Sequence, residues 1–315
     1  MRKIISLFIL YSTFAYANAQ RLDRFRFEAP LSFALHGGPT QYFGDLYSFW
    51  NYREGLQPDY NVTLTAKWTT GTNIRLRANL SYYQISGDDN AADPRSGRML
   101  RKLNFRAQNW EGSFQVEYYL LPVKLYHVNR SYFNPYFFVG AGLTTNDPHA
   151  RYRGKWIPLR PLKTENKAYP ATAAVFPMGL GIKYKTNVWV DVFIEGNYRF
   201  TLTDYLDDVS KYNISGFYED LIADYGRWGE GPNPNRLRLA IRQERYLFEN
   251  GEPNIELIRA TNGAARRGSG DPSLTGSRGR YDGYFTLNVG VEIFVAENIW
   301  DDWIFRKKRG GYRLR

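Results

Sequence analysis

The chain contains no cysteine among its 315 residues, and it has only three histidines and three methionines. The missing cysteine excludes a disulfide-stapled scaffold and any zinc or iron–sulfur site that is built on thiolates. The three histidines are His36, His127 and His149, and their scatter along the chain argues against a histidine metal site. We therefore expect neither a bound metal nor a cofactor.

Long apolar runs are also absent after the first twenty residues. The longest uncharged runs, residues 131–146 and 168–182, are too short to cross a bilayer as helices, and proline and glycine interrupt both. This excludes a bundle of transmembrane helices. A composition of 43% hydrophobic, 17% aromatic and 23% charged residues excludes a disordered chain.

Residues 1–19 have the organisation of an export signal. Arg2 and Lys3 form a charged start, residues 4–14 are mostly apolar, and Ala17 and Ala19 give a small-x-small cleavage site. We expect residues 20–27 to be a short periplasmic segment. Without the two signal cations the formal net charge falls from +11 to +9, which favours acidic partners such as anionic lipid headgroups. An exported chain is not expected to bind nucleic acid.

Apolar and polar residues alternate with a period of two along eight segments. In residues 188–202, Val192 and Ile194 share one face, whereas Asp191 and Glu195 share the other. The other segments are residues 28–38, 60–68, 74–84, 110–120, 135–144, 174–184 and 284–295. A soluble β-sandwich shows the same alternation, so the pattern alone leaves two all-β folds open.

The connections between these segments favour a barrel. They alternate between long and short, as the outer loops and periplasmic turns of bacterial barrels do, and the strand number is even. We predict an eight-stranded antiparallel transmembrane barrel over residues 28–295, integral to the outer membrane, with both termini in the periplasm. Aromatic residues near strand ends are expected to form interfacial girdles, among them Tyr42, Trp68, Trp110 and Tyr284.

The last long connection, residues 203–283, is predicted to be a large extracellular insertion. Residues 217–225 and 235–249 have the pattern of short helices, which makes the insertion partly helical. A connection of this length usually carries structure or contacts a partner. The second helix is rich in arginine, with Arg236, Arg238, Arg242 and Arg245.

The inward faces of the predicted strands carry equal numbers of cations and anions. An eight-stranded barrel is just wide enough for its side chains to fill, so we expect these charges to pair across the lumen rather than to line a pore or a catalytic cleft. The cations are Lys67, Arg75, Arg77, Lys183 and Arg199, and the anions are Glu111, Glu117, Asp191, Glu195 and Glu292.

No catalytic residues are expected. His36 is the best candidate for a general base, with Ser32 and Asp45 close in sequence, but no strand carries a recognisable pair of base and nucleophile. We predict that the protein is not an enzyme.

Two acidic elements lie at equivalent heights, after the first and the seventh predicted strands. The first contains Asp45, and the second is the string Thr203–Ser210 with Asp204, Asp207 and Asp208. Carboxylates of this kind can bind a cation, but we favour a role in capping or pinning the loops.

Together with the export signal, the eight strands and the polar approach to the last strand, these motifs resemble the PorG-type outer-membrane barrel of the type IX secretion system. The resemblance covers roughly residues 27–295. It implies an integral outer-membrane component that associates with periplasmic ring proteins, and with other outer-membrane components, and that is needed to export cargo, including gliding adhesins in some bacteria. The alternative is a stand-alone adhesin or ligand-binding barrel that acts through its outer loops.

Residues 296–315 are predicted to form a basic periplasmic tail. It would dock on an acidic protein surface or on lipid headgroups, or it would simply be solvated. The predicted turn between the fourth and fifth strands offers Lys124, His127 and Arg130 as an alternative docking site. The tail cations are Arg306, Lys307, Lys308, Arg309, Arg313 and Arg315.

Overall fold

The computed structural model describes residues 31–47, 56–92, 102–123, 131–186, 190–210, 218–241, 248–260 and 281–295. The predicted signal peptide, the segment 20–27 and the basic tail lie outside these ranges. Across the described ranges, no helix combines the length and the apolar character needed to cross a membrane.

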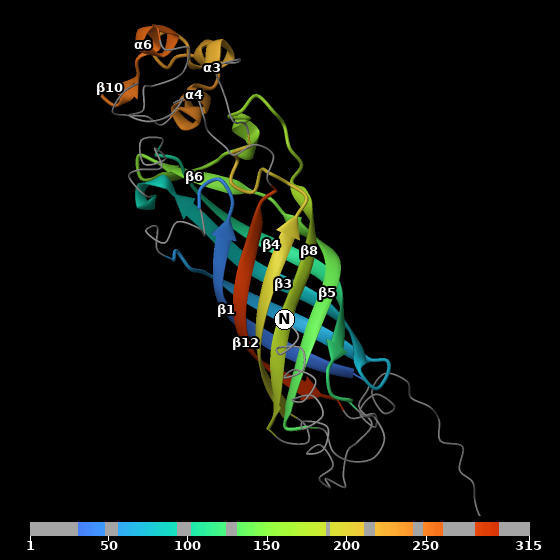
Figure 1. Ribbon diagram of the computed structural model, residues 1–315. Helices are drawn as coiled ribbons and strands as arrows, with labels where there is room; N and C mark the ends of the chain where they lie inside the picture. The colour runs from blue at the N-terminus through green and yellow to red at the C-terminus, as the bar shows by residue number, and fades with distance from the viewer. Residues whose placement is uncertain are drawn as a thin grey trace, which may run out of the picture.

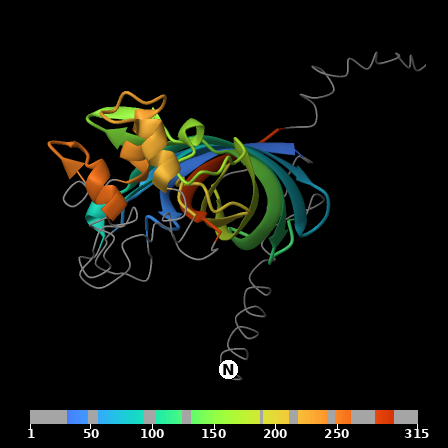
Figure 2. The same ribbon diagram turned by 90° about the horizontal axis from the view of Figure 1, so that it is seen from above.

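Eight strands form one antiparallel sheet that closes on itself (Figure 1). The order around the barrel is β3-β2-β1-β12-β9-β8-β5-β4, and the pairing of β3 with β4 completes the ring that Figure 2 shows from above. The predicted fold is thus confirmed. The strands are β1 (Leu31–Phe43), β2 (Asp59–Thr69), β3 (Ile74–Asp88), β4 (Asn104–Tyr119), β5 (Phe133–Thr145), β8 (Thr172–Lys185), β9 (Val190–Thr201) and β12 (Gly283–Phe294).

The barrel has two different ends. β1 and β12 are neighbours, and the register pairs Ser32 with Phe294 at one end and Phe43 with Gly283 at the other. We call the first the termini end and the second the loop end. The short connection from β2 to β3 lies at the termini end, because Leu31 pairs with Trp68 there.

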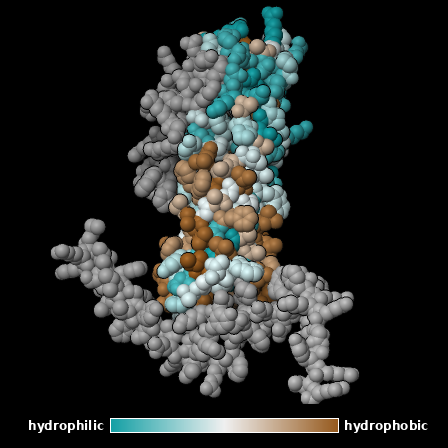
Figure 3. Space-filling view, turned by 90° about the vertical axis from the view of Figure 1, so that its right-hand side faces the viewer, coloured by the Kyte–Doolittle hydropathy of each residue, from teal (hydrophilic) through white to brown (hydrophobic). Residues whose placement is uncertain are grey.

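The barrel is polar inside and apolar outside, the reverse of a soluble protein. On β2, Thr63 and Thr65 are buried in the lumen, whereas Val62 and Leu64 are 51% and 54% exposed on the outer wall. Successive side chains of a strand point to opposite faces, so each strand contributes to both surfaces. Apolar atoms gather over the barrel wall in Figure 3, and the loop end above it is hydrophilic.

The strands at the loop end are longer than the sequence pattern predicted. β1 continues to Phe43, β3 continues to Asp88, and β4 already begins at Asn104. A hairpin of β6 (Pro148–Tyr152) and β7 (Lys155–Pro158) adds to the edge of β4. The sequence pattern does not predict this hairpin, because its strands are too short to show a period of two. Short 3-10 helices follow β3 (Asp89–Ala91, η1) and β7 (Arg160–Leu162, η3).

The insertion between β9 and β12 is partly helical, with α3 (Tyr218–Tyr225), α4 (Pro234–Ala240) and α6 (Ile255–Ala260). The expected helix 235–249 is wrong at its last two residues, where Phe248 and Glu249 form a strand, and α4 ends at Ala240. β10 (Phe248–Glu249) and β11 (Glu252–Pro253) pair around Asn250 and Gly251, which both have positive φ. An Asn-Gly pair is a strong signal for a tight hairpin turn, and it overrides the helical pattern. Arg242 and Arg245 lie outside the described residues.

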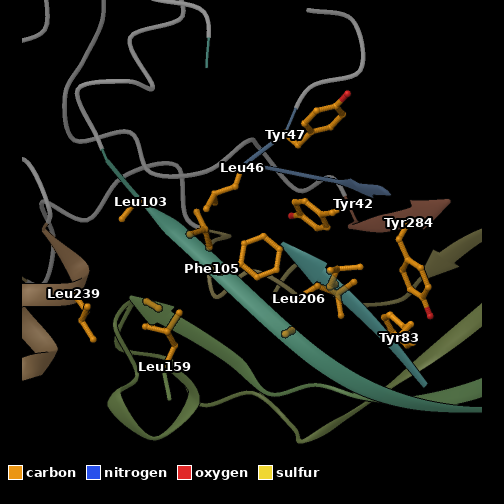
Figure 4. Packing of buried hydrophobic residues seen from close by; sticks show 14 residues of the cluster. Tyr42, Leu46, Tyr47, Tyr83, Leu103, Phe105, Leu159, Leu206, Leu239 and Tyr284 are labelled. Carbon is orange, nitrogen blue, oxygen red and sulfur yellow. The ribbon is translucent and has the colours of Figure 1, made fainter. Parts of the chain in front are cut away.

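Apolar residues gather in a core at the loop end. Tyr42, Leu46, Phe105, Leu206 and Tyr284 pack together above the lumen (Figure 4). The expectation that Tyr42 and Tyr284 belong to an interfacial girdle is therefore wrong, because both side chains are fully buried. Both side chains point to the inner face of their strands and so into this core, whereas Trp68 and Trp110 are half exposed on the outer wall. A second apolar cluster joins α3, α4 and α6 within the insertion.

Candidate functional site

Arg77 lies at the centre of a network of charges that fills the lumen. Its Nη1 is 3.0 Å from Glu117 Oε1 and 2.9 Å from Glu195 Oε2, and its Nε donates to Gln115 Oε1 at 2.6 Å. Lys67 Nζ is 2.9 Å from the same Glu117 oxygen. These groups come from β2, β3, β4 and β9, so the ion pairs connect strands on different sides of the barrel.

Glu292 on β12 collects the cations nearer the termini end. Arg75 Nη1 is 2.6 Å from its Oε1, and Lys183 Nζ is 2.5 Å from its Oε2. Toward the loop end, Arg199 Nε is 2.7 Å from Glu111 Oε2, which also accepts a hydrogen bond from the Tyr284 hydroxyl. Asp191 is buried beside Arg75 and Lys183. The structure thus places all ten sequence-selected charges inside the barrel.

Aromatic rings fill the space that the ion pairs leave. Phe138 lies under the Arg77 guanidinium at 3.9 Å, and Tyr119 lies 4.8 Å from Lys183 Nζ. Tyr136 occupies the room above Gly181, where any side chain would collide with its ring. A cavity beside Arg75 and Lys183 measures about 10 Å³, room for about one water molecule. The charged and aromatic side chains named above are all buried.

His36 is part of this packing. Its Nε2 is 3.0 Å from Thr65 Oγ1 and its Nδ1 is 3.7 Å from Glu195 Oε1, while its ring packs edge-on against Phe193. Ser32 donates to Glu292 instead of lying near the histidine. Among the described residues there is also no group of three potential ligands able to hold a metal ion.

The acidic loop motifs meet at the loop end, where they hold chain segments together. Asp208 accepts hydrogen bonds from the hydroxyls of Thr164 and Tyr169, and Asp207 accepts from the Val209 amide at 3.0 Å. Asp204 accepts from Ser210 Oγ at 2.7 Å. Asp45 is buried in the same region. These contacts connect the segment after β9 to the connection between η3 and β8.

Asp282 also belongs to this cluster, although no sequence motif predicts it. Its carboxylate accepts from the Tyr42 hydroxyl at 2.8 Å and from the Leu206 amide at 2.9 Å. The side chain is fully buried and connects β1, the start of β12 and the segment after β9. A single aspartate before a strand gives no sequence signal for this role, because its partners are distant in the chain.

Burial sets the ionisation of these carboxyls. It raises the pKa of Asp208 to about 7 and that of Asp204 to about 6. Burial also raises the pKa of Asp207 and of Asp282, and each is raised further by a neighbouring carboxylate. The cluster therefore binds protons more readily than exposed aspartates do.

Two predicted docking sites lie outside the described residues. One is the basic tail, Arg306, Lys307, Lys308, Arg309, Arg313 and Arg315. The other is the turn with Lys124, His127 and Arg130. Both remain predictions.

The closed ring, its apolar wall and its ion-paired lumen define a barrel of the outer-membrane type. The chain belongs to the family described as "Domain of unknown function (DUF6089)", whose model matches residues 29–219. Among curated proteins, none matches the chain.

Three solved outer-membrane barrels resemble the chain. Neisserial surface protein A gives a TM-score of 0.39 at 9% identity, with 85% of this chain and 98% of that chain covered. OprG from Pseudomonas aeruginosa gives 0.34 at 10%, with 85% and 98% covered. Ail of Yersinia pestis gives 0.34 at 7%, with 84% and 99% covered. At these scores the likenesses add nothing to a fold that follows from the strand pairing itself.

Proposed function

We propose that this chain is a non-enzymatic, integral outer-membrane component of a type IX secretion apparatus, where it anchors or positions the periplasmic ring proteins. The observation that carries this proposal is the filled lumen. A barrel whose interior is occupied by ion pairs and rings conducts no solute, so its function must lie on its outer surfaces and at its two ends.

The assignment to a secretion apparatus rests on the resemblance of the loop motifs, with Asp45 after the first strand and Thr203–Ser210 after the seventh, to those of PorG-type barrels. The basic tail supports an anchoring role, because its cations come after the last strand in the sequence, at the C-terminal end of the chain. In the proposed orientation the termini end faces the periplasm, where a ring of acidic surface would meet the tail.

Rigidity supports the same role. Four buried glutamates of the lumen, Glu111, Glu117, Glu195 and Glu292, each contact at least one cation. Removing one partner of a buried ion pair costs far more than removing an exposed one, so the network holds the strands in one arrangement. Such a barrel is suited to hold a fixed position for other proteins.

The experiment that tests the proposal is co-purification from detergent-solubilised outer membranes. Replacing Arg306, Lys307, Lys308 and Arg309 by glutamine should reduce the recovery of periplasmic partners severalfold at moderate salt, since exposed charges are screened over about 8–10 Å. The matched control removes four exposed cations at the loop end: Lys163, Lys167, Arg227 and Arg259. Equal recovery with both variants would move the docking site to the turn with Lys124, His127 and Arg130.

A stand-alone adhesin or ligand-binding barrel is the second candidate function. It is favoured by the built structure at the loop end, where the insertion has its own apolar cluster and Arg153 Nη2 is 2.9 Å from Glu252 on β11. A purified barrel that brings no periplasmic partner, with or without its tail, would support this candidate over the scaffold.

A further inference from the structure

Residues 203–210 follow β9 at the loop end of the barrel, and we call them the strap. Leu206 of the strap is fully buried and packs with Tyr42 and Tyr284 in the apolar core above the lumen (Figure 4). At Asp208 the chain turns with a φ of 68°, a left-handed conformation that residues other than glycine seldom adopt. Such a backbone persists only where surrounding contacts hold it, so the position of the strap depends on its contacts.

Two buried carboxyls, Asp207 and Asp282, connect the strap to the barrel. Asp282, directly before β12, accepts from the Leu206 amide at 2.9 Å and from the Tyr42 hydroxyl at 2.8 Å. Asp207 accepts from the Val209 amide at 3.0 Å, and its other oxygen, Oδ2, has no hydrogen-bond partner among the described residues. Tyr42 interacts with both carboxyls and so lies between the strap and the start of β12.

Gly44 shields this contact from water. A side chain at position 44 would collide with the Tyr42 hydroxyl and with the Asp282 carboxylate, so the backbone of Gly44 lies directly against their hydrogen bond. A carboxylate that is shielded in this way loses the water that stabilises its charge. The site therefore disfavours a second negative charge beside the first.

The groups that face the two carboxyls are anionic. Asp45 faces both Asp207 and Asp282, and Asp204 faces Asp282. Within the described part of the chain, no lysine or arginine forms an ion pair with either carboxyl, and Lys167 faces Asp204 instead. The remaining titratable groups around the strap are Arg160, Glu165, Tyr169, Tyr205 and Asp208.

Protons must therefore balance the charge of this pair. Burial and repulsion between neighbouring carboxylates raise the pKa of Asp207 and of Asp282. Asp282 accepts two hydrogen bonds, which suits its charged form, whereas Asp207 Oδ2 lacks a donor, which suits a protonated oxygen. A protonated Asp207 can donate to the Tyr42 oxygen while Tyr42 donates to Asp282. One proton then completes a chain of hydrogen bonds from the strap to the start of β12.

A small cavity gives water a place beside the strap. It measures about 30 Å³ and is lined in part by Asp207, Asp208 and Val209, room for about two water molecules. An ionised Asp207 would draw water toward its carboxylate, because a buried charge without a partner is costly. Hydration of Asp207 would then compete with the contact between the strap and Tyr42.

We propose that the strap is a proton-controlled lid over the lumen, closed while Asp207 and Asp282 share one proton through Tyr42 and open once that proton is lost. Opening would expose the mouth of the lumen beneath Leu206 and would free the segment that leads into the insertion. Because both carboxyls have a raised pKa, the closed lid is favoured at low pH and is lost as the pH rises. This lid lies at the loop end and is independent of the proposed secretion role.

The test measures how fast a thiol in the strap reacts with iodoacetamide, in the full chain folded in phosphatidylcholine nanodiscs. Val209→Cys places the thiol at a buried position of the strap. Every variant also carries Asp208→Asn, because Asp208 has a pKa of about 7 and titrates as well. The reaction rate is divided by that of the same protein with Asp207→Asn, whose amide keeps a hydrogen toward Tyr42 at every pH. This ratio cancels the ionisation of the thiol itself.

The ratio should rise at least about tenfold between pH 7.5 and pH 10, a range that lies above the pKa of about 6 of Asp204. Asp282→Asn should suppress the rise as Asp207→Asn does, whereas Glu256→Gln, at an exposed carboxyl on α6, should leave it unchanged. A ratio that stays near one over this range would overturn the proposal, and so would a rise that persists in Asp282→Asn. Heat-modifiable mobility at each pH confirms that the barrel is folded, so that unfolding is not counted as opening.

Discussion

Arg77 is the residue on which the lumen network depends most, because it is buried and contacts two buried carboxylates. We expect Arg77→Met to lower the free energy of unfolding by about 3–5 kcal/mol, since it leaves the charge of Glu195 without its closest cation. Urea unfolding of the barrel in phosphatidylcholine vesicles, followed by tryptophan fluorescence, measures this loss.

The control for this prediction removes both charges. Arg77→Met/Glu195→Gln should be more stable than Arg77→Met alone, because no unpaired charge remains in the lumen. Leu64→Met, on the exposed outer wall of β2, should change the free energy of unfolding by less than about 1 kcal/mol. Equal losses for the single and the double variant would mean that Arg77 acts through packing against Phe138 rather than through charge.

The inward position of each lumen charge could be predicted from the sequence, whereas its partner could not. Alternation with a period of two places Arg75 and Glu292 on the inner face, and the structure has both there. Their contact joins residues that are 217 positions apart, and it depends on the closure of β1 against β12. Asp282 was missed for the same reason, since burial by three distant segments leaves no local pattern.

At the scale of elements, the segment after β9 is held by carboxyls that prefer to be protonated. Burial raises the pKa of Asp208 to about 7, whereas an unfolded aspartate titrates near 3.9. A raised pKa of this kind gives stability that is complete below pH 4 and is lost as the pH rises toward 7. We therefore expect hydrogen-exchange protection of residues 203–210 to be at least about tenfold higher at pH 5 than at pH 8.

Protection factors are the suitable measure because they correct for the intrinsic pH dependence of exchange. Asp208→Asn should flatten the decline between pH 5 and 8, since an amide keeps the same size without titrating. Asp147→Asn, at an exposed carboxyl of the same end of the barrel, should leave the decline unchanged. A profile in Asp208→Asn that still matches the wild type would assign the pH dependence to the other carboxyls with a raised pKa: Asp204, Asp207 and Asp282.

The strand β4 tests which part of the outer wall contacts lipid. Phe114 is 77% exposed and lies four residues from Trp110 in the direction of the termini end. Phe114→Arg should cost roughly 2–4 kcal/mol of folding free energy in a bilayer, the range for a cation near the midplane. Gln108→Arg lies on the same face beyond Trp110 and should cost about 1 kcal/mol or less. Equal costs in vesicle unfolding would contradict the apolar band as the lipid contact.

Strands were predictable where the alternation of apolar and polar residues extends over many positions, and less so where a tight turn interrupts it. Residues 74–84 and 110–120 show the alternation clearly, and they correspond to the parts of β3 and β4 nearer the termini end. The parts of β3 and β4 that extend past the aromatic girdle toward the loop end are polar on the outer face. They therefore lack the alternation of apolar and polar residues that predicts a strand. The predicted second helix of the insertion is wrong at Phe248 and Glu249, because they pair with Glu252 and Pro253 around a hairpin turn at Asn250 and Gly251.

At the scale of the whole molecule, closure explains why a chain without disulfides keeps a defined shape. The pairing of the first strand with the last leaves no open edge in the ring of eight strands, and every strand has two partners. The charges are sheltered inside, and the loop end is sealed by the core around Tyr42 and Leu206. What the sequence does not encode locally is which outer surface meets a partner, because that depends on proteins other than this chain.

Orientation in the membrane is the last prediction, and the absence of native cysteine makes it direct to test. Asn90 and Glu256 are exposed at the loop end, and Thr72 is exposed in the short turn at the termini end. In intact cells, Asn90→Cys and Glu256→Cys should react with a membrane-impermeant maleimide, whereas Thr72→Cys should react only after the outer membrane is permeabilised. Short turns face the periplasm in bacterial barrels, which is the physical reason for this assignment. Labelling of Thr72→Cys in intact cells, with Asn90→Cys protected, would reverse the orientation and would place the loop end on the periplasmic side.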